Sequence, residues 1–139
     1  MERRREAMNA QEVLRALVEQ IRHREGPDGL IIVEARYGAL PTGDNHESSI
    51  KIIDVTVPLQ ALVKDSILKI TTTSSKSNLT GFYDPCIGEE KSLYIKYLLR
   101  SQAHVVLYRD NDPILLPNRG KSILFQKIKQ LTKFSYNFL

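Results

Sequence analysis

The chain has 139 residues, of which 42% are hydrophobic and 26% charged, a balance typical of one folded domain with a genuine core. Its net charge of +4 is spread along the chain, so an acidic partner, nucleic acid or an anionic membrane is compatible with it but not required. The single cysteine, Cys86, excludes an internal disulfide and a cysteine-rich zinc site, and no apolar run reaches the ~18 residues of a transmembrane helix.

The first predicted element is a helix over residues 8–25, where apolar residues recur at helical spacing until Gly26-Pro27 ends the helix. The opposite side is charged. Two interpretations stay open, since the helix could pack on its own domain or be the end of a longer coiled coil, of which under two heptads of a/d seam are present here. The candidate binding residues of this helix are Leu14, Leu17 and Ile21.

From residue 29 the hydrophobic period changes from helical to alternating, which predicts β-strands. Six short strands joined by polar turns favour a mainly β fold, a small antiparallel β-sandwich or a partly open barrel. The absence of βαβ alternation argues against a parallel nucleotide-binding sheet. Pro58 cannot donate to a ladder, so pairing should break or meet a sheet edge there. The predicted strands are 30–37, 50–59, 67–73, 92–100, 103–109 and 114–116.

Two local features of these strands are predicted as well. Within 30–37, alternation predicts one face made of Ile31, Val33, Ala35 and Tyr37. The short break at Ser101-Gln102 predicts a tight hairpin between the fourth and fifth strands.

A long connection over residues 74–90, rich in Ser, Asn, Gly and Pro, joins the third strand to the fourth. Loops of this length often bind partners, and its two aromatic residues are capable of exposure. We therefore take its second half, the Gly81–Lys91 loop, as a second candidate contact surface. Its candidate binding residues are Phe82, Tyr83, Asp84, Pro85 and Cys86.

The sequence offers little for catalysis. A reactive thiolate at Cys86 would need a base such as His104, and no catalytic signature surrounds either residue. A small buried side chain in a structured loop is the simpler interpretation of Cys86. The three histidines lie in separate segments without metal-ligand spacing. We therefore expect no enzyme, no catalytic residue, no cofactor, no metal and no small-molecule substrate.

Residues 118–139 are ambiguous between a helix packed on the domain, a mobile tail and a basic amphipathic helix on a membrane surface. Apolar residues, from Leu124 to Phe138, share one helical face, and lysines lie mainly opposite. The arginines at 3–5 make the other end basic too, although without a nucleic-acid module nucleic-acid binding is disfavoured. A peripheral membrane module that uses these basic ends is the alternative function.

Several ordered blocks together resemble one known family. They are Gly29 to Val33 continuing to Gly38, Ile53 to Gln60, Leu62 to Ser66, and Gly81 to Cys86 with Gly88 to Lys91 following. In this order and with these gaps, the blocks are similar to the C-terminal domain of the DnaJ homologue subfamily C member eleven family. We accordingly divide the chain into a charged helix and linker (1–28), a β-rich domain (29–117) and a basic tail (118–139).

The resemblance implies a mitochondrial, outer-membrane-associated protein that contacts the sorting and cristae-organising complexes and helps to organise the inner membrane. It implies a scaffold domain without catalytic residues, preceded by a charged helical segment. The His-Pro-Asp tripeptide of a J domain is absent, so this chain should not stimulate an Hsp70 ATPase and is expected to be a fragment or a short form. The tail after Pro117 does not match the ending of the family. Glutamates scattered through the first helix argue against a cleavable presequence, and no secretory signal is present.

Overall fold

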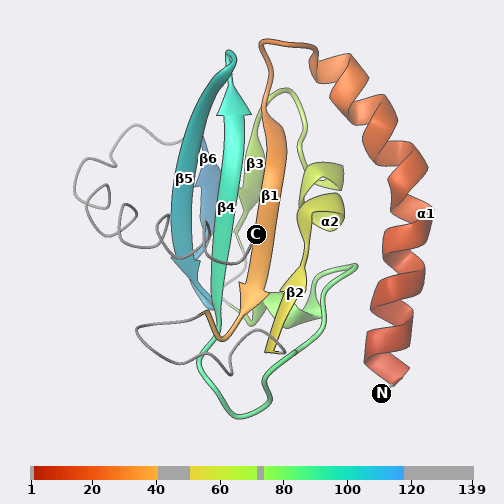
Figure 1. Cartoon of the computed structure of the whole chain (residues 1–139), viewed down its shortest axis with the longest axis vertical. Helices are drawn as coiled ribbons and strands as arrows, with labels where there is room; N and C mark the ends of the chain where they lie inside the picture. Colours follow the sequence, from red (N-terminus) through yellow and green to blue (C-terminus); the bar gives the residue numbers. More distant parts are fainter. Residues whose placement is uncertain (1, 41–50, 72–73, 118–139) are drawn as a thin grey trace.

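The computed structural model describes residues 2–40, 51–71 and 74–117 (Figure 1). The chain begins with helix α1 (Glu2–Glu25), strand β1 (Ile31–Gly38), strand β2 (Ile52–Asp54), helix α2 (Thr56–Ala61) and strand β3 (Leu68–Ile70). A 3-10 turn, η2 (Lys76–Asn78), precedes strands β4 (Ser92–Leu99), β5 (Gln102–Arg109) and β6 (Ile114–Leu116).

Two antiparallel sheets form the body of the molecule. The larger has the strand order β2-β1-β4-β5, and the smaller pairs β3 with β6. Figure 1 shows β3 and β6 behind the larger sheet, with α1 and α2 along its β1 side. Side chains of both sheets share one hydrophobic core, which includes Leu68, Ile95 and Leu116. The predicted mainly β, partly open fold of six strands behind an N-terminal helix is therefore confirmed. The predicted tail helix lies outside the described residues.

The second predicted strand is wrong beyond its first half. Strand β2 ends at Asp54, and residues 56–61 form α2. Pro58 is the third residue of this helix, where its missing N–H is one that the first turn would leave unpaired in any case. The proline does break the strand pairing, as expected, but it does so inside a helix that buries Leu59 and Gln60.

Strand β1 contains a bulge at Val33. Ile32 pairs with Tyr97 and Glu34 with Lys96, so Val33 has no partner on β4. The extra residue shifts the alternation, which buries Ile32 and leaves Val33 45% exposed. The prediction was therefore wrong for the first half of this strand and right for the second, where Ala35 and Tyr37 are both buried.

The hairpin between β4 and β5 has a two-residue loop, Arg100-Ser101. Both residues have positive φ (52° and 63°), which is the backbone that a tight turn between twisted strands requires. The predicted hairpin is confirmed, one residue earlier than expected. The Arg100 N–H also donates to the Asp28 carbonyl (3.2 Å) and so ties the hairpin to the segment after α1.

Beyond its pairing with the short β2, the outer edge of β1 is covered by a side-chain amide. Gln60 Oε1 accepts from the Ile32 N–H (2.7 Å), and Gln60 Nε2 donates to the Leu30 carbonyl (3.3 Å). A residue of a neighbouring parallel strand would make the same two bonds. The fully buried Gln60 amide therefore takes the place of one strand residue.

Helix α1 is attached mainly through polar side chains that bond to the backbone of the domain, and it buries only Ala7, Val18 and Ile21. Arg3 Nη2 donates to the carbonyls of Ser77 and Leu79 (3.1 Å each). These bonds hold the first turn, so the helix begins at residue 2 rather than at residue 8. The other attachments are Gln11 to the Asp54 and Gly81 carbonyls, Arg22 to the Ile32 carbonyl, Arg24 to the Val63 carbonyl, and Glu25 to Ser66.

Candidate interaction site

The loop before β4 points its largest apolar side chain into the molecule. Phe82 is 0% exposed and belongs to the core, where its ring meets the Tyr37 ring edge-on at a centroid distance of 5.3 Å. The expectation that Phe82 is exposed is therefore wrong. A side chain that fills the core stabilises the loop and is not available to a partner.

The other predicted residues of this loop are bonded in place or packed. Asp84 accepts from the Cys86 N–H (2.9 Å) and pairs with Lys91 Nζ (3.2 Å). Pro85 packs beside Gly38, where a Cβ would come within 2.9 Å of its ring. Tyr83 is half-exposed, and the Arg4 guanidinium lies 6.0 Å from its ring centroid.

A buried lysine that sequence reasoning missed fixes the start of the same loop. Lys76 is only 1% exposed, and its ammonium donates to the carbonyls of Arg109 (2.8 Å), Asp110 (2.8 Å) and Asp112 (2.6 Å). All three donors of the group are thereby satisfied. The sequence carries no signal for this role, because a lysine among serines and asparagines is typical of a solvated loop.

The Asp110 carboxylate completes this network. It accepts from Tyr37 Oη (2.5 Å), Ser75 Oγ (2.8 Å) and the Lys76 N–H (2.9 Å). Burial raises the pKa of Asp110, but these three bonds outweigh it and hold the pKa below its usual value. Burial, with the Asp110 bond, raises the pKa of Tyr37, and burial lowers the pKa of Lys76. The network therefore stabilises the loop by placing the charged Asp110 carboxylate near the buried Lys76 ammonium.

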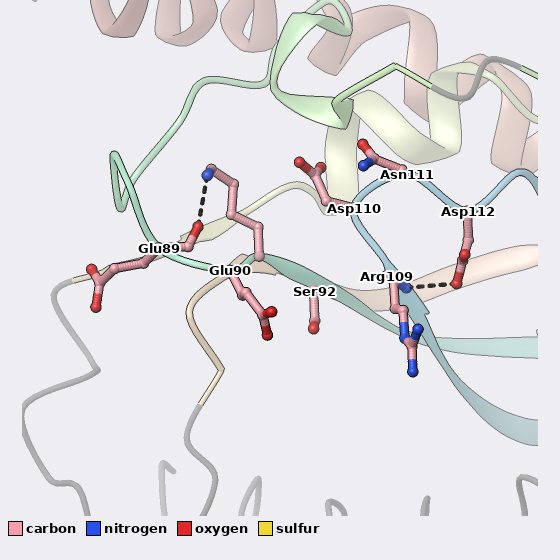
Figure 2. A pocket seen from close by; sticks show the side chains of 8 residues that line it. Glu89, Glu90, Ser92, Arg109, Asp110, Asn111 and Asp112 are labelled. Atoms are coloured by element: carbon pink, nitrogen blue, oxygen red, sulfur yellow. Dashed lines mark hydrogen bonds between the residues drawn. The ribbon is translucent and has the colours of Figure 1, made fainter.

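A polar cavity of about 630 Å³ lies between residues 89–92 and 109–112 (Figure 2). Several polar groups that line it bond to one another, since Lys91 Nζ donates to the Glu89 carbonyl (2.9 Å) and the Arg109 N–H donates to the Asp112 carboxylate (3.0 Å). Glu89 also pairs with Lys51 at 2.9 Å. Among the described residues, no group of three His, Cys, Asp or Glu side chains could hold a metal ion. The cavity offers no constellation that would define a ligand.

Cys86 and His104 are not neighbours. Burial raises the pKa of the Cys86 thiol, which lies near the Ala39 backbone. Ala39 follows the last residue of β1, Gly38, which pairs with Ser92 at the start of β4. His104 stacks on Tyr97 (5.1 Å between ring centroids), five residues after Ser92 and hence about 16 Å further along β4. A direct hydrogen bond is out of reach, so this pair does not form a catalytic dyad.

The predicted residues of α1 divide between the domain and the solvent. Ile21 is buried, Leu14 is half-buried and Leu17 is 44% exposed. Val13, which the a/d interpretation left out, lies one turn before Leu17 and is 77% exposed. Part of the predicted seam is therefore used inside the domain. The Val13–Leu17 strip, made of these two side chains with Leu14 at its border, faces outward.

Exposed apolar residues also lie next to the last turn of α1. Leu62 and Ile67 are exposed, and they flank residues that bond to Arg24 and Glu25. Over residues 2–40, 51–71 and 74–117, no helix is both long and apolar enough to cross a membrane. The apolar surface on this side of the molecule is thus concentrated on α1 and on the segment beside its end.

Comparison with known proteins gives a family and several relatives. The family model described as "DnaJ-like protein C11, C-terminal" matches residues 1–117. The "DnaJ homolog subfamily C member 11" of Pongo abelii is 43% identical over 128 residues, which is 88% of this chain and 22% of the relative. That of Mus musculus is 46% identical over 114 residues (81% and 20%), and a Dictyostelium discoideum homolog is 41% identical over 101 residues (69% and 18%). The chain thus spans about a fifth of the length of these relatives. No solved structure matches.

Proposed function

The chain belongs to the family described as DnaJ-like protein C11, C-terminal, and from this premise we propose that it is a non-catalytic protein-interaction domain that acts as a scaffold. The relatives carry the DnaJ name, so this is a J-protein-related domain. The further step, from family membership to a scaffold, rests on how the domain uses α1.

The outward side of α1 is the observation that carries the proposal. The helix is fixed by five side chains that bond to other segments, among them Arg3, Gln11 and Arg22. Because these polar groups make the attachment, Val13 and Leu17 are not needed to hold the helix. An immobilised helix with exposed apolar residues at i and i+4 is the arrangement that a partner groove or partner helix recognises.

The energy available from this strip suits a reversible contact. Covering one exposed Val or Leu side chain contributes roughly 1.5–3 kcal/mol. The helix is already ordered, so little conformational entropy is lost when a partner binds. We expect the Val13–Leu17 strip to be the centre of the interface and the flanking charged side chains to form its rim.

The cellular setting is proposed from the sequence resemblance. We propose that the domain acts in mitochondria, in association with the outer membrane, and that its partners are among the sorting and cristae-organising complexes. The relatives are about five times longer than this chain, so the activity of the whole protein is proposed for it only as far as this domain contributes.

Proximity labelling in cells that express this chain tests compartment and partner together. We expect wild type to label mitochondrial membrane-organising proteins and the Val13→Ser/Leu17→Ser variant to lose most of that labelling. The control variant, Ala16→Ser/His23→Ser, changes two exposed residues on another side of α1 and should label as wild type does. Labelling of another compartment, or equal labelling by all three chains, would refute the proposal.

A further inference from the structure

A second surface of α1 combines positive charge with apolar groups, and we propose that it binds an acidic, partly apolar segment of a protein partner. It consists of Arg4, Arg5, Met8 and Asn9 together with Tyr83 from the loop before β4. We call it the Arg4–Tyr83 surface. The inference rests on the proposed interaction function and adds the chemistry of the partner.

Two elements build the Arg4–Tyr83 surface. Four α1 side chains line a shallow hollow of about 380 Å³, and the Arg4 guanidinium extends over the Tyr83 ring. Arg3, the neighbouring arginine, points elsewhere and holds the helix to the Ser77 and Leu79 carbonyls. The guanidinium of Arg4 is thus presented from a fixed backbone and lies 6.0 Å from the centroid of the Tyr83 ring.

The charges of this surface are not neutralised by the domain. Arg3 pairs with Glu6 (3.7 Å) and Arg15 with Glu12 (3.3 Å). Across the described ranges, no carboxylate lies within ion-pair distance of Arg4 or Arg5. Asp84, which follows Tyr83 in the loop, is already paired with Lys91. Two guanidiniums therefore remain for an external anion.

The rest of the surface favours a polypeptide partner. A guanidinium binds a carboxylate through two parallel hydrogen bonds, and Met8, 57% exposed, adapts its shape to apolar side chains. Arg, Met and Tyr are enriched in protein–protein interfaces. Glu2, together with the ion pairs of Glu6 and Glu12, interrupts the positive charge of the helix, which disfavours the continuous negative charge of a bilayer or a nucleic acid. One or two carboxylates can instead reach Arg4 and Arg5 alone.

Fluorescence anisotropy with the full chain tests the inference. The probe is a labelled peptide of repeated Glu-Glu-Leu, and its Lys-Lys-Leu counterpart and phosphatidylcholine–phosphatidylserine vesicles serve as comparisons. We expect the Arg4→Gln/Arg5→Gln variant to bind the acidic peptide about 10-fold more weakly, with salt weakening wild type in the same direction. The control, Arg15→Gln/Lys69→Gln, also removes two exposed positive charges and should change the affinity less than about 2-fold.

The outcomes separate this inference from the proposed function. No binding of the acidic peptide, equal weakening in both variants, or binding to vesicles in preference to the peptide would overturn the Arg4–Tyr83 surface. The single variant Arg5→Gln, whose side chain is exposed, keeps the test valid if the double variant unfolds. The Val13→Ser/Leu17→Ser variant should bind the peptide normally, so failure of the labelling experiment alone would leave this surface standing.

Discussion

The loop before β4 and helix α1 both looked like contact surfaces in the sequence, and the structure uses them in opposite ways. The loop points its aromatic Phe82 into the core and ties its backbone down through Lys76. The helix is attached through polar side chains and keeps Val13 and Leu17 outside. The core therefore holds Phe82 of the loop, whereas polar bonds make much of the attachment of α1 and leave Val13 and Leu17 exposed.

The largest expected effect on stability concerns the loop before β4, which points Phe82 into the core. Phe82→Ala should lower the free energy of unfolding by about 3–5 kcal/mol, since it removes a fully buried ring and leaves a cavity. Urea denaturation measures it. The neighbouring Tyr83→Ala, at a half-exposed position, should cost about 1 kcal/mol or less. Similar losses in the two variants would mean that the loop is not anchored through Phe82. Reduced partner binding by Phe82→Ala would report unfolding rather than a lost contact.

A second test concerns helix α2, whose Gln60 amide covers the edge of β1. Gln60→Leu should cost about 2 kcal/mol, because the Ile32 N–H and the Leu30 carbonyl lose their partner while they remain buried. Thermal unfolding followed by circular dichroism is suitable. Gln20→Leu, an exposed position on α1, is the matched control and should change stability by less than about 0.5 kcal/mol. A Gln60→Leu variant as stable as wild type would show that the amide bonds are dispensable.

The network that holds the loop predicts a dependence on pH. The pKa of Asp110 is lowered in the folded state, so its contribution is fully present above the unfolded pKa of about 3.9 and is lost as the pH falls through the folded value. Asp110→Asn should cost about 1–2 kcal/mol at pH 7 and show a shallower loss of stability below about pH 4. The exposed Asp28→Asn is the control for removing one carboxylate. Parallel acid profiles for wild type and Asp110→Asn would contradict this account.

The smallest expected effect on stability sharpens the comparison most. Val13→Ser/Leu17→Ser should change the free energy of unfolding by less than about 1 kcal/mol, because neither side chain fills the core. A melting curve compared with that of Ala16→Ser/His23→Ser is enough. A much larger loss would mean that the strip holds α1 on the domain, and the Val13–Leu17 strip would then lose its role as a free contact surface.

Much of the architecture follows from hydrophobic periodicity, which identified the N-terminal helix, the alternating strands and the β4–β5 hairpin. Periodicity failed where a tertiary contact decides the local structure. Residues 56–59 alternate like a strand, yet they fold into α2 because the helix places Gln60 on the β1 edge. The bulge at Val33 is equally hidden, since a shift of register depends on the partner strand.

The candidate residues were predicted less well than the fold. Leu17 and Tyr83 lie at accessible positions, whereas Phe82 is buried because the Tyr37 ring and the core receive it. Val13 was missed because a heptad pattern weighs only two positions in seven. Lys76 could not have been found from the sequence, because its three acceptors come from a turn more than thirty residues away.

The amide of Gln60 also determines how the larger sheet meets other molecules. An uncovered strand edge recruits further strands and is a starting point for aggregation. With Gln60, Thr56 and Arg22 on the donors and acceptors of β1, strand addition on that side would first have to displace two helices. Partners that approach the β1 side therefore meet side chains rather than backbone, so recognition there depends on amino-acid identity instead of the sequence-blind pairing of one strand with another.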